Sequence, residues 1–301
     1  MNMSKESPAN ALIRTVCLFL STLLTAAVLV QHASSQQRSS QGSSLALSRP
    51  SALVGSATAA DKNTPECITA IPPGTILPVR LNSTLSSTKS RKGQPITGRI
   101  MQDVPLSPRV KIKEGSKVFG HIVEVTPATS GADARISIQF DKLVSSHQAI
   151  SITTNLRAIA GFMRIMQAQT PPIGPGESDV YRWLTTVQVG GDVVYGAGGP
   201  VTTGDDPNDV VGKSVDGGVL AKVRGREGTS CRGPIDGNDT PQALWMFSSD
   251  ACGTYGLDHI GIEHAGRTNP TGVIVLVSAS GSLNVRSGAG MLLRVNASSP
   301  D

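Results

Sequence analysis

Two related passages between residues 71 and 125 constrain the fold of this chain more than any other feature. The first is IPPGTILPVRL (Ile71–Leu81) and the second is VKIKEGSKVFGHIV (Val110–Val123). Each has an apolar lead-in, a Gly-Thr or Gly-Ser turn, and then alternating apolar and polar residues, the pattern of a half-buried strand. The alternation changes face around Gly120, which predicts a β-bulge there. Two such units in so short a stretch predict a small, strongly curved sheet or barrel.

Further strands extend this pattern to residue 156. The segment RISIQFD, starting at Arg135, alternates strictly and points Ile136, Ile138 and Phe140 inward. The fold class we expect is mainly β, with a barrel-like β domain over residues 68–156. Its predicted strands are Ile76–Leu81, Pro95–Met101, Val110–Ile112, Lys117–Val125, Arg135–Leu143 and Ala149–Thr154.

These turns carry a resemblance. IPPGTILPV at Ile71–Val79, Gly93-Gln94 before a strand, and KEGSKVFG at Lys113–Gly120 resemble the β-barrel of conjugal-transfer and type IV secretion channel proteins. The chain is more similar still to uncharacterised exported envelope proteins of the acidobacterial type that carry this barrel. The resemblance covers roughly residues 68–155, and it implies a β-barrel fold in the cell envelope.

The N-terminal region has the composition of an export signal followed by a linker. Lys5 and Arg14 precede an apolar run from Val16 to Val30, and small residues follow it before Gln36. We expect residues 1–35 to be a signal peptide, with an uncleaved membrane anchor as the alternative. Residues 36–67 are rich in Ser, Gln and Ala without a helical or strand period, which predicts a disordered linker. The expected location is therefore the periplasm or the extracellular space.

A change of period separates the barrel-like domain from the rest of the chain. Apolar residues at positions 159, 162, 163 and 166 follow helical spacing, which predicts one bridging amphipathic helix over residues 157–169. Its stripe of Ile159, Phe162, Met163 and Met166 is expected to be buried against the barrel. Thr170-Pro171-Pro172 ends the helix. Several short apolar runs with Gly-rich turns then predict a second β-rich region over residues 170–301.

Charge is distributed unevenly between the two β regions. Residues 68–156 contain 11 Lys and Arg against 5 Asp and Glu, whereas residues 170–301 contain 9 against 14. The basic region predicts a surface that meets an envelope protein or an anionic cell-wall component. Its two aromatic residues, Phe119 and Phe140, fall on predicted strands, so we expect no nucleic-acid partner. The only membrane contact we expect is an uncleaved leader.

Cys231 and Cys252 are predicted to form a disulfide. They lie in a Gly-rich segment, and an exported chain reaches an oxidising compartment. Closing a loop of this size would stabilise the fold by about 3 kcal/mol on the chain-entropy model.

The densest group of ionisable residues comprises Asp258, His259, Glu263, His264 and Arg267. On the strand that Ile260 and Ile262 predict, His259 and Glu263 would lie roughly 13 Å apart, at about 3.3 Å per residue. One metal ion could not bind both side chains. We therefore expect no metal, no cofactor and no catalytic residue, and we treat the group as a candidate binding site.

Three functions follow from these observations as hypotheses. The first is a non-catalytic exported envelope structural or interaction protein. The second is a cell-wall or extracellular glycan-binding protein, for which Trp183, Tyr195, Trp245 and Tyr255 would supply stacking faces. The third is a hydrolase built around Asp258, His259, Glu263 and His264.

Overall fold

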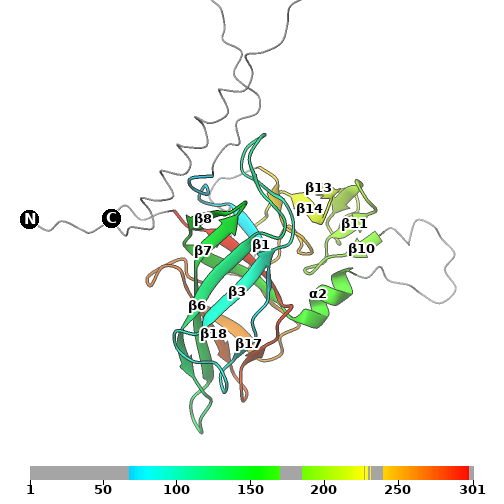
Figure 1. Cartoon of the computed structure of the whole chain (residues 1–301). Helices are drawn as coiled ribbons and strands as arrows, with labels where there is room; N and C mark the ends of the chain where they lie inside the picture. Colours follow the sequence, from blue (N-terminus) through cyan, green and yellow to red (C-terminus); the bar gives the residue numbers. More distant parts are fainter. Residues whose placement is uncertain (1–67, 170–184, 227, 230, 232–239, 298–301) are drawn as a thin grey trace, which may run out of the picture. The chain divides into compact units, whose positions relative to one another are not determined.

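The computed structural model describes residues 68–169, 185–226, 228–229, 231 and 240–297, all within one compact unit over residues 62–301. Its secondary structure is mainly β with one helix, which confirms the predicted fold class (Figure 1). The expected signal peptide (1–35) and linker (36–67) lie outside the described residues. No helix in the described ranges is both long and apolar enough to cross a bilayer.

A ten-stranded sheet forms the larger part of the structure. Along β3 and the first half of β6, buried residues alternate with exposed or half-buried ones, so the alternation read from the sequence places one face in the core. The main path of strands runs in the order β16 (Gly253–Tyr255), β9 (Thr154–Ala160), β20 (Gly290–Val295), β1 (Ile76–Leu81), β3 (Pro95–Ile100), β6 (Lys117–Thr126), β7 (Ala134–Ser145), β18 (Val273–Ser278) and β17 (Ile260–His264), and β8 (Gln148–Ser151) also pairs with β7.

This sheet curves into a nearly closed barrel, as expected from the turn-and-strand pattern. The two end strands of the path, β16 and β17, come close to each other, and Leu156 N donates a hydrogen bond of 2.8 Å to Ala265 O across the gap. The predicted bulge is confirmed, because the β6–β7 register shifts between Phe119 and Gly120. A side chain at Gly120 would clash, since an added Cβ would lie 2.1 Å from Gln139 O.

The barrel contains strands from both predicted β regions, residues 68–156 and residues 170–301. β20 lies between β1 and β9, and β18 pairs with β7. Figure 1 shows the consequence, with cyan and green strands beside orange and red ones in one sheet. Residues 68–156 therefore do not complete a sheet of their own, and the second β-rich region divides between this barrel and a smaller sheet.

The smaller sheet has six strands in sequence order and packs through a second apolar cluster that includes Trp245 and Phe247. Two short ladders, β2 (Leu85–Ser86) with β19 (Asn284–Val285) and β4 (Val104–Pro105) with β5 (Lys111–Ile112), complete the strands. The strands of the smaller sheet are β10 (Thr185–Val187), β11 (Val193–Tyr195), β12 (Pro200–Thr202), β13 (Val210–Val215), β14 (Gly218–Ala221) and β15 (Gln242–Ala243).

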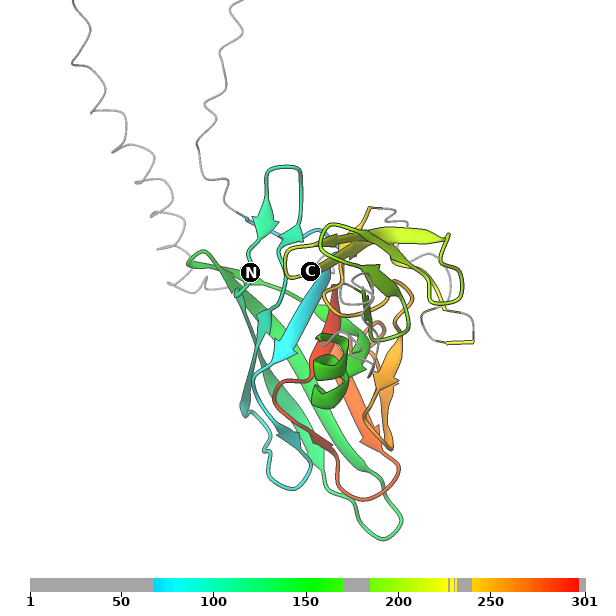
Figure 2. The same ribbon diagram turned by 90° about the vertical axis from the view of Figure 1, so that its right-hand side faces the viewer.

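The bridging helix exists but differs from its prediction. It begins at Phe162 rather than Arg157, because residues 157–160 belong to strand β9. The helix, α2 (Phe162–Gln169), lies beside the barrel and buries Ile165 and Ala168 (Figure 2). The expected burial of the whole apolar stripe is wrong, since Met163 is 61% exposed and Met166 is 40% exposed.

Candidate functional site

The predicted ionisable group does not converge on one point. Asp258 and His259 are exposed in the turn before β17. Glu263 points outward from β17, where its Oε1 accepts a hydrogen bond of 2.8 Å from Arg135 Nη1 on β7. His264 Nδ1 lies 2.7 Å from Val273 O and its Nε2 lies 3.1 Å from Thr268 Oγ1. These contacts brace the connection between β17 and β18 and assemble no acid–base pair.

No group of three or more His, Cys, Asp or Glu side chains in the described ranges is placed to hold a metal ion.

Among the aromatic candidates that the structure describes, Tyr195 on β11 is 42% exposed, whereas Trp245 is buried and Tyr255 is half-buried, so no two of them form an exposed stacking platform. Trp183 lies outside the described residues. Trp245 is 1% exposed, and it packs with the second apolar cluster. Tyr255 is half-buried on β16, where its hydroxyl lies 2.9 Å from Arg226 Nη1 and 3.0 Å from the backbone N of Cys252. Tyr255 therefore braces the segment that carries Cys252.

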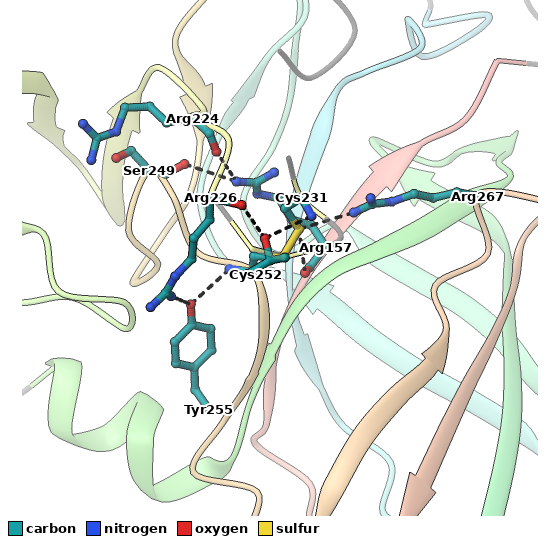
Figure 3. Close-up of a disulfide and its surroundings, with 9 residues drawn as sticks. Arg157, Arg224, Arg226, Cys231, Ser249, Cys252, Tyr255 and Arg267 are labelled. Atoms are coloured by element: carbon teal, nitrogen blue, oxygen red, sulfur yellow. Dashed lines mark hydrogen bonds between the residues drawn. A yellow bond between two sulfur atoms is a disulfide. The ribbon is translucent and has the colours of Figure 1, made fainter. Parts of the chain in front are cut away.

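The disulfide between Cys231 and Cys252 is confirmed, with a Cα–Cα distance of 6.0 Å (Figure 3). Arg267, the last member of the ionisable group, reaches this disulfide instead of the two histidines. Its Nη2 lies 3.4 Å from Cys231 Sγ, and burial lowers the pKa of its guanidinium.

Arg157 lies next to the disulfide and is 2% exposed. Its Nη2 donates 2.6 Å to Arg224 O and 3.4 Å to Ser249 O, so the guanidinium ties β9 to the loops that carry the disulfide (Figure 3). Burial, reinforced by the charge of Arg267, lowers the pKa of Arg157 to about 10. It remains charged at neutral pH and binds carbonyl groups, so we assign it a structural role.

A different group of cations is brought together on the outer face of the barrel. The register pairs Arg80 of β1 with Arg99 of β3, and Arg99 with Lys117 of β6. Residues directly opposite each other on antiparallel strands point to the same face, with Cβ atoms about 4.5–5.5 Å apart. We call these three residues the basic row. Figure 1 shows β1, β3 and β6 side by side.

The basic row has no acidic counterpart within the part of the chain that the structure describes. None of its three side chains forms an ion pair, whereas the nearby Lys111 pairs with Asp103 and His121 lies 3.0 Å from Asp141. Like charges directly opposite each other destabilise a sheet. The fold thus keeps an unneutralised line of positive charge at a small cost.

A cleft of about 340 Å³ lies at the β1–β3 end of the basic row. Arg80 and Arg99 supply its charge, and Asn82 and Ser287 supply further polar side chains. Leu81, Met101 and Gly288 complete its lining. We call it the basic cleft. Guanidinium groups in such a setting can bind phosphate or carboxylate groups in a bidentate manner.

A fourth cation lies on the same outer face, although Val144 rather than this cation is the residue opposite Lys117 on β7. Lys142 of β7 pairs in register with Phe119 of β6, and its Nζ lies 5.0 Å from the centre of the Phe119 ring. This cation–π contact fixes the stem of Lys142 over an aromatic ring while its charge stays accessible. The excess of Lys and Arg over residues 68–156 is visible in the sequence, but the register that brings three of these cations together is visible only in the structure.

Neither protein-family models nor curated proteins give a match to this chain.

Proposed function

We propose that this chain is a non-catalytic exported envelope protein that binds an anionic cell-wall component through the basic row and its cleft. The observation that carries the proposal is the register Arg80–Arg99–Lys117, which holds three cations together without a carboxylate. An anionic polymer would supply the missing negative charge from outside the molecule. Such binding is electrostatic and falls as salt screens the charges.

The shape of the surface supports a polymer as the ligand. The row crosses three adjacent strands at the 4.7–4.9 Å spacing that is typical of sheets, so its charges extend over about 10 Å. Lys142 continues the positive surface onto a fourth strand. A chain with repeating phosphate or carboxylate groups could contact several of these cations at once, and each contact would be weak alone.

The other two hypotheses have less support. Glycan stacking would need exposed aromatic faces, and Trp245 is buried within the second apolar cluster. A hydrolase would need paired acid and base groups, and Glu263 and His264 each make separate structural contacts.

Export is part of the proposal. The apolar leader expected over residues 1–35 and the Cys231–Cys252 disulfide both fit an oxidising compartment outside the cytoplasm.

Co-sedimentation of the purified protein with isolated bacterial cell walls tests this function. The bound fraction should be large at low salt and should fall as salt is raised. The double variant Arg99→Glu/Lys117→Glu should lose binding at low salt. The matched control is Lys213→Glu/Lys222→Glu, which makes the same change of net charge on the exposed strands of the smaller sheet.

Two outcomes would contradict the proposal. One is binding that does not depend on salt. The other is an equal loss of binding in both double variants, because overall charge rather than the basic row would then be responsible.

A further inference from the structure

A second cleft of about 350 Å³ opens where the smaller sheet, the end of α2 and the rim of the barrel meet. Met101 lines both this cleft and the basic cleft, so the two are neighbours. Its walls come from segments far apart in the chain, from Met101 at the end of β3 to Met246 after β15. We call it the junction cleft.

Two buried glutamines fix the wall formed by Trp245. This residue has a φ of 53°, a conformation that non-glycine residues rarely adopt. Its backbone N donates 2.7 Å to Gln102 Oε1, and its carbonyl accepts 3.1 Å from Gln188 Nε2. Gln102 also donates 2.8 Å to Val219 O. Both ends of the strained residue are therefore held by side chains, and its position against the cleft is rigid.

The same contacts leave one acceptor of the cleft without a donor. A carbonyl group accepts only from an N–H or O–H donor, so the amide nitrogen of Gln188 must face Trp245 O. Its Oε1 then points elsewhere, and it is buried with no hydrogen-bond partner. Gln188 is 3% exposed and lines the junction cleft. Buried polar atoms in native proteins are nearly always satisfied, so this acceptor is an exception. It has almost no accessible surface and lies beneath the lining, where no donor offsets its partial negative charge.

The charge of the lining has one sign. Glu114 contributes a carboxylate to the lining. Its Oε2 would lie 3.2 Å from a Cβ added to Gly217, which places the carboxylate directly over the β13–β14 turn. Glu114 forms no ion pair with the described residues, and none of the described Lys, Arg or His residues lines this cleft. Thr186 and Ser214 add hydroxyl groups, while Val194, Val215, Val219 and the two methionines add apolar surface.

We infer that the junction cleft binds an alkylammonium group, such as the side-chain amine of a lysine or a free alkylamine. The ammonium would donate to the exposed Glu114 carboxylate, and the apolar stem would pack against the valine and methionine side chains. A lining of acceptors with a single negative charge selects against phosphate and carboxylate ligands, which the basic cleft would take. The inference does not depend on the proposed function, since it uses none of the residues of the basic row.

Titration of the full-length protein, followed by NMR of the Trp245 indole and the Gln188 side-chain amide, tests this site. n-Butylamine at neutral pH should give saturable shifts at both groups. n-Butanol and sodium butyrate have the same stem and should give no saturable shift. Nα-acetyl-lysine methylamide distinguishes the two sources, since saturable binding by it would show that the cleft accepts a lysine within a polypeptide. Binding of n-butylamine alone would assign the site to free amines.

Variants separate the carboxylate from general charge effects. Glu114→Gln should weaken n-butylamine binding by up to about fivefold, the range expected for a solvent-accessible ion pair. The matched control Glu124→Gln removes an exposed glutamate from β6 and should leave the affinity unchanged. Equal shifts with n-butanol and n-butylamine would overturn the inference, as would unchanged affinity in Glu114→Gln. Glu114 is exposed at a turn, so its variant should fold.

Discussion

The basic cleft and the junction cleft lie on either side of Met101, yet they arise in different ways. Pairing of three neighbouring strands places Arg80, Arg99 and Lys117 in one row on the outer face of the barrel. The junction cleft instead depends on Gln102 and Gln188, which reach Trp245 from distant parts of the chain. Strand register alone can therefore create a charged surface, whereas a shaped cleft with a buried acceptor needs tertiary packing.

The same difference predicts how the two clefts respond to substitution. The basic row is exposed, so changes there should alter binding with little effect on folding. The wall of the junction cleft is part of the core, so changes there should alter both.

Trp245→Ala should have the largest effect, because it removes a fully buried indole from the second apolar cluster. We expect it to lower the free energy of unfolding by about 3–5 kcal/mol in urea titrations. Tyr195→Ala is the control, since Tyr195 is 42% exposed and its loss should change stability by less than about 0.5 kcal/mol. The folded fraction of Trp245→Ala should still bind cell walls, and loss of that binding would show that the two clefts are coupled.

Gln102→Leu should have an intermediate effect. The side chain is fully buried, and its removal leaves the backbone N of Trp245 without its acceptor, whereas Val219 O keeps the hydrogen bond from Leu244 N. The stranded N–H group should cost about 1–3 kcal/mol. Urea unfolding measures the loss, with the exposed Gln167→Leu as control. A loss below 1 kcal/mol would mean that the strained conformation of Trp245 does not need this brace.

Arg99→Gln should have the smallest effect on stability. Unlike the two substitutions above, it should stabilise the fold. It removes the central charge of the basic row and relieves repulsion with Arg80 and Lys117. The free energy of unfolding should rise by about 0.2–1 kcal/mol at low salt, and the gain should shrink at high salt. Arg109→Gln changes an exposed arginine in a loop and should show no such gain. A destabilised Arg99→Gln would show that the row is not repulsive.

Much of the barrel could be predicted from the sequence because its strands obey local rules. Alternation in β7, the turns beside β1 and β6, and the bulge at Gly120 all appear as residue patterns over a few positions. The Cys231–Cys252 pair was also predictable, since few alternatives exist in that segment.

The start of the helix was predicted wrongly for a physical reason. All seven residues of β9 are buried, because β20 and β16 flank the strand and the second cluster covers its other face. A strand buried on both faces shows no alternation of apolar and polar residues. Ile159 lies three residues before Phe162, and this spacing matched that of a helical stripe by coincidence.

The junction cleft could not be predicted because its contacts span long stretches of sequence. Gln102 and Trp245 meet across 143 residues, and Gln188 and Trp245 across 57. Neither glutamine stands out in the sequence, since nothing local distinguishes a buried glutamine from an exposed one. The ionisable group at residues 258–267 attracted attention by density alone, and its members turned out to brace separate contacts.

The position of β20 between β1 and β9 has a consequence for how the chain matures. During synthesis, β1 and β9 emerge from the ribosome long before Gly290–Val295. Both strands then present unpaired edges that other polypeptides can pair with. We therefore expect the nascent protein to remain incompletely folded, and prone to aggregation without chaperones, until its last strand arrives. A truncation before residue 290 should consequently yield aggregates rather than a smaller soluble barrel.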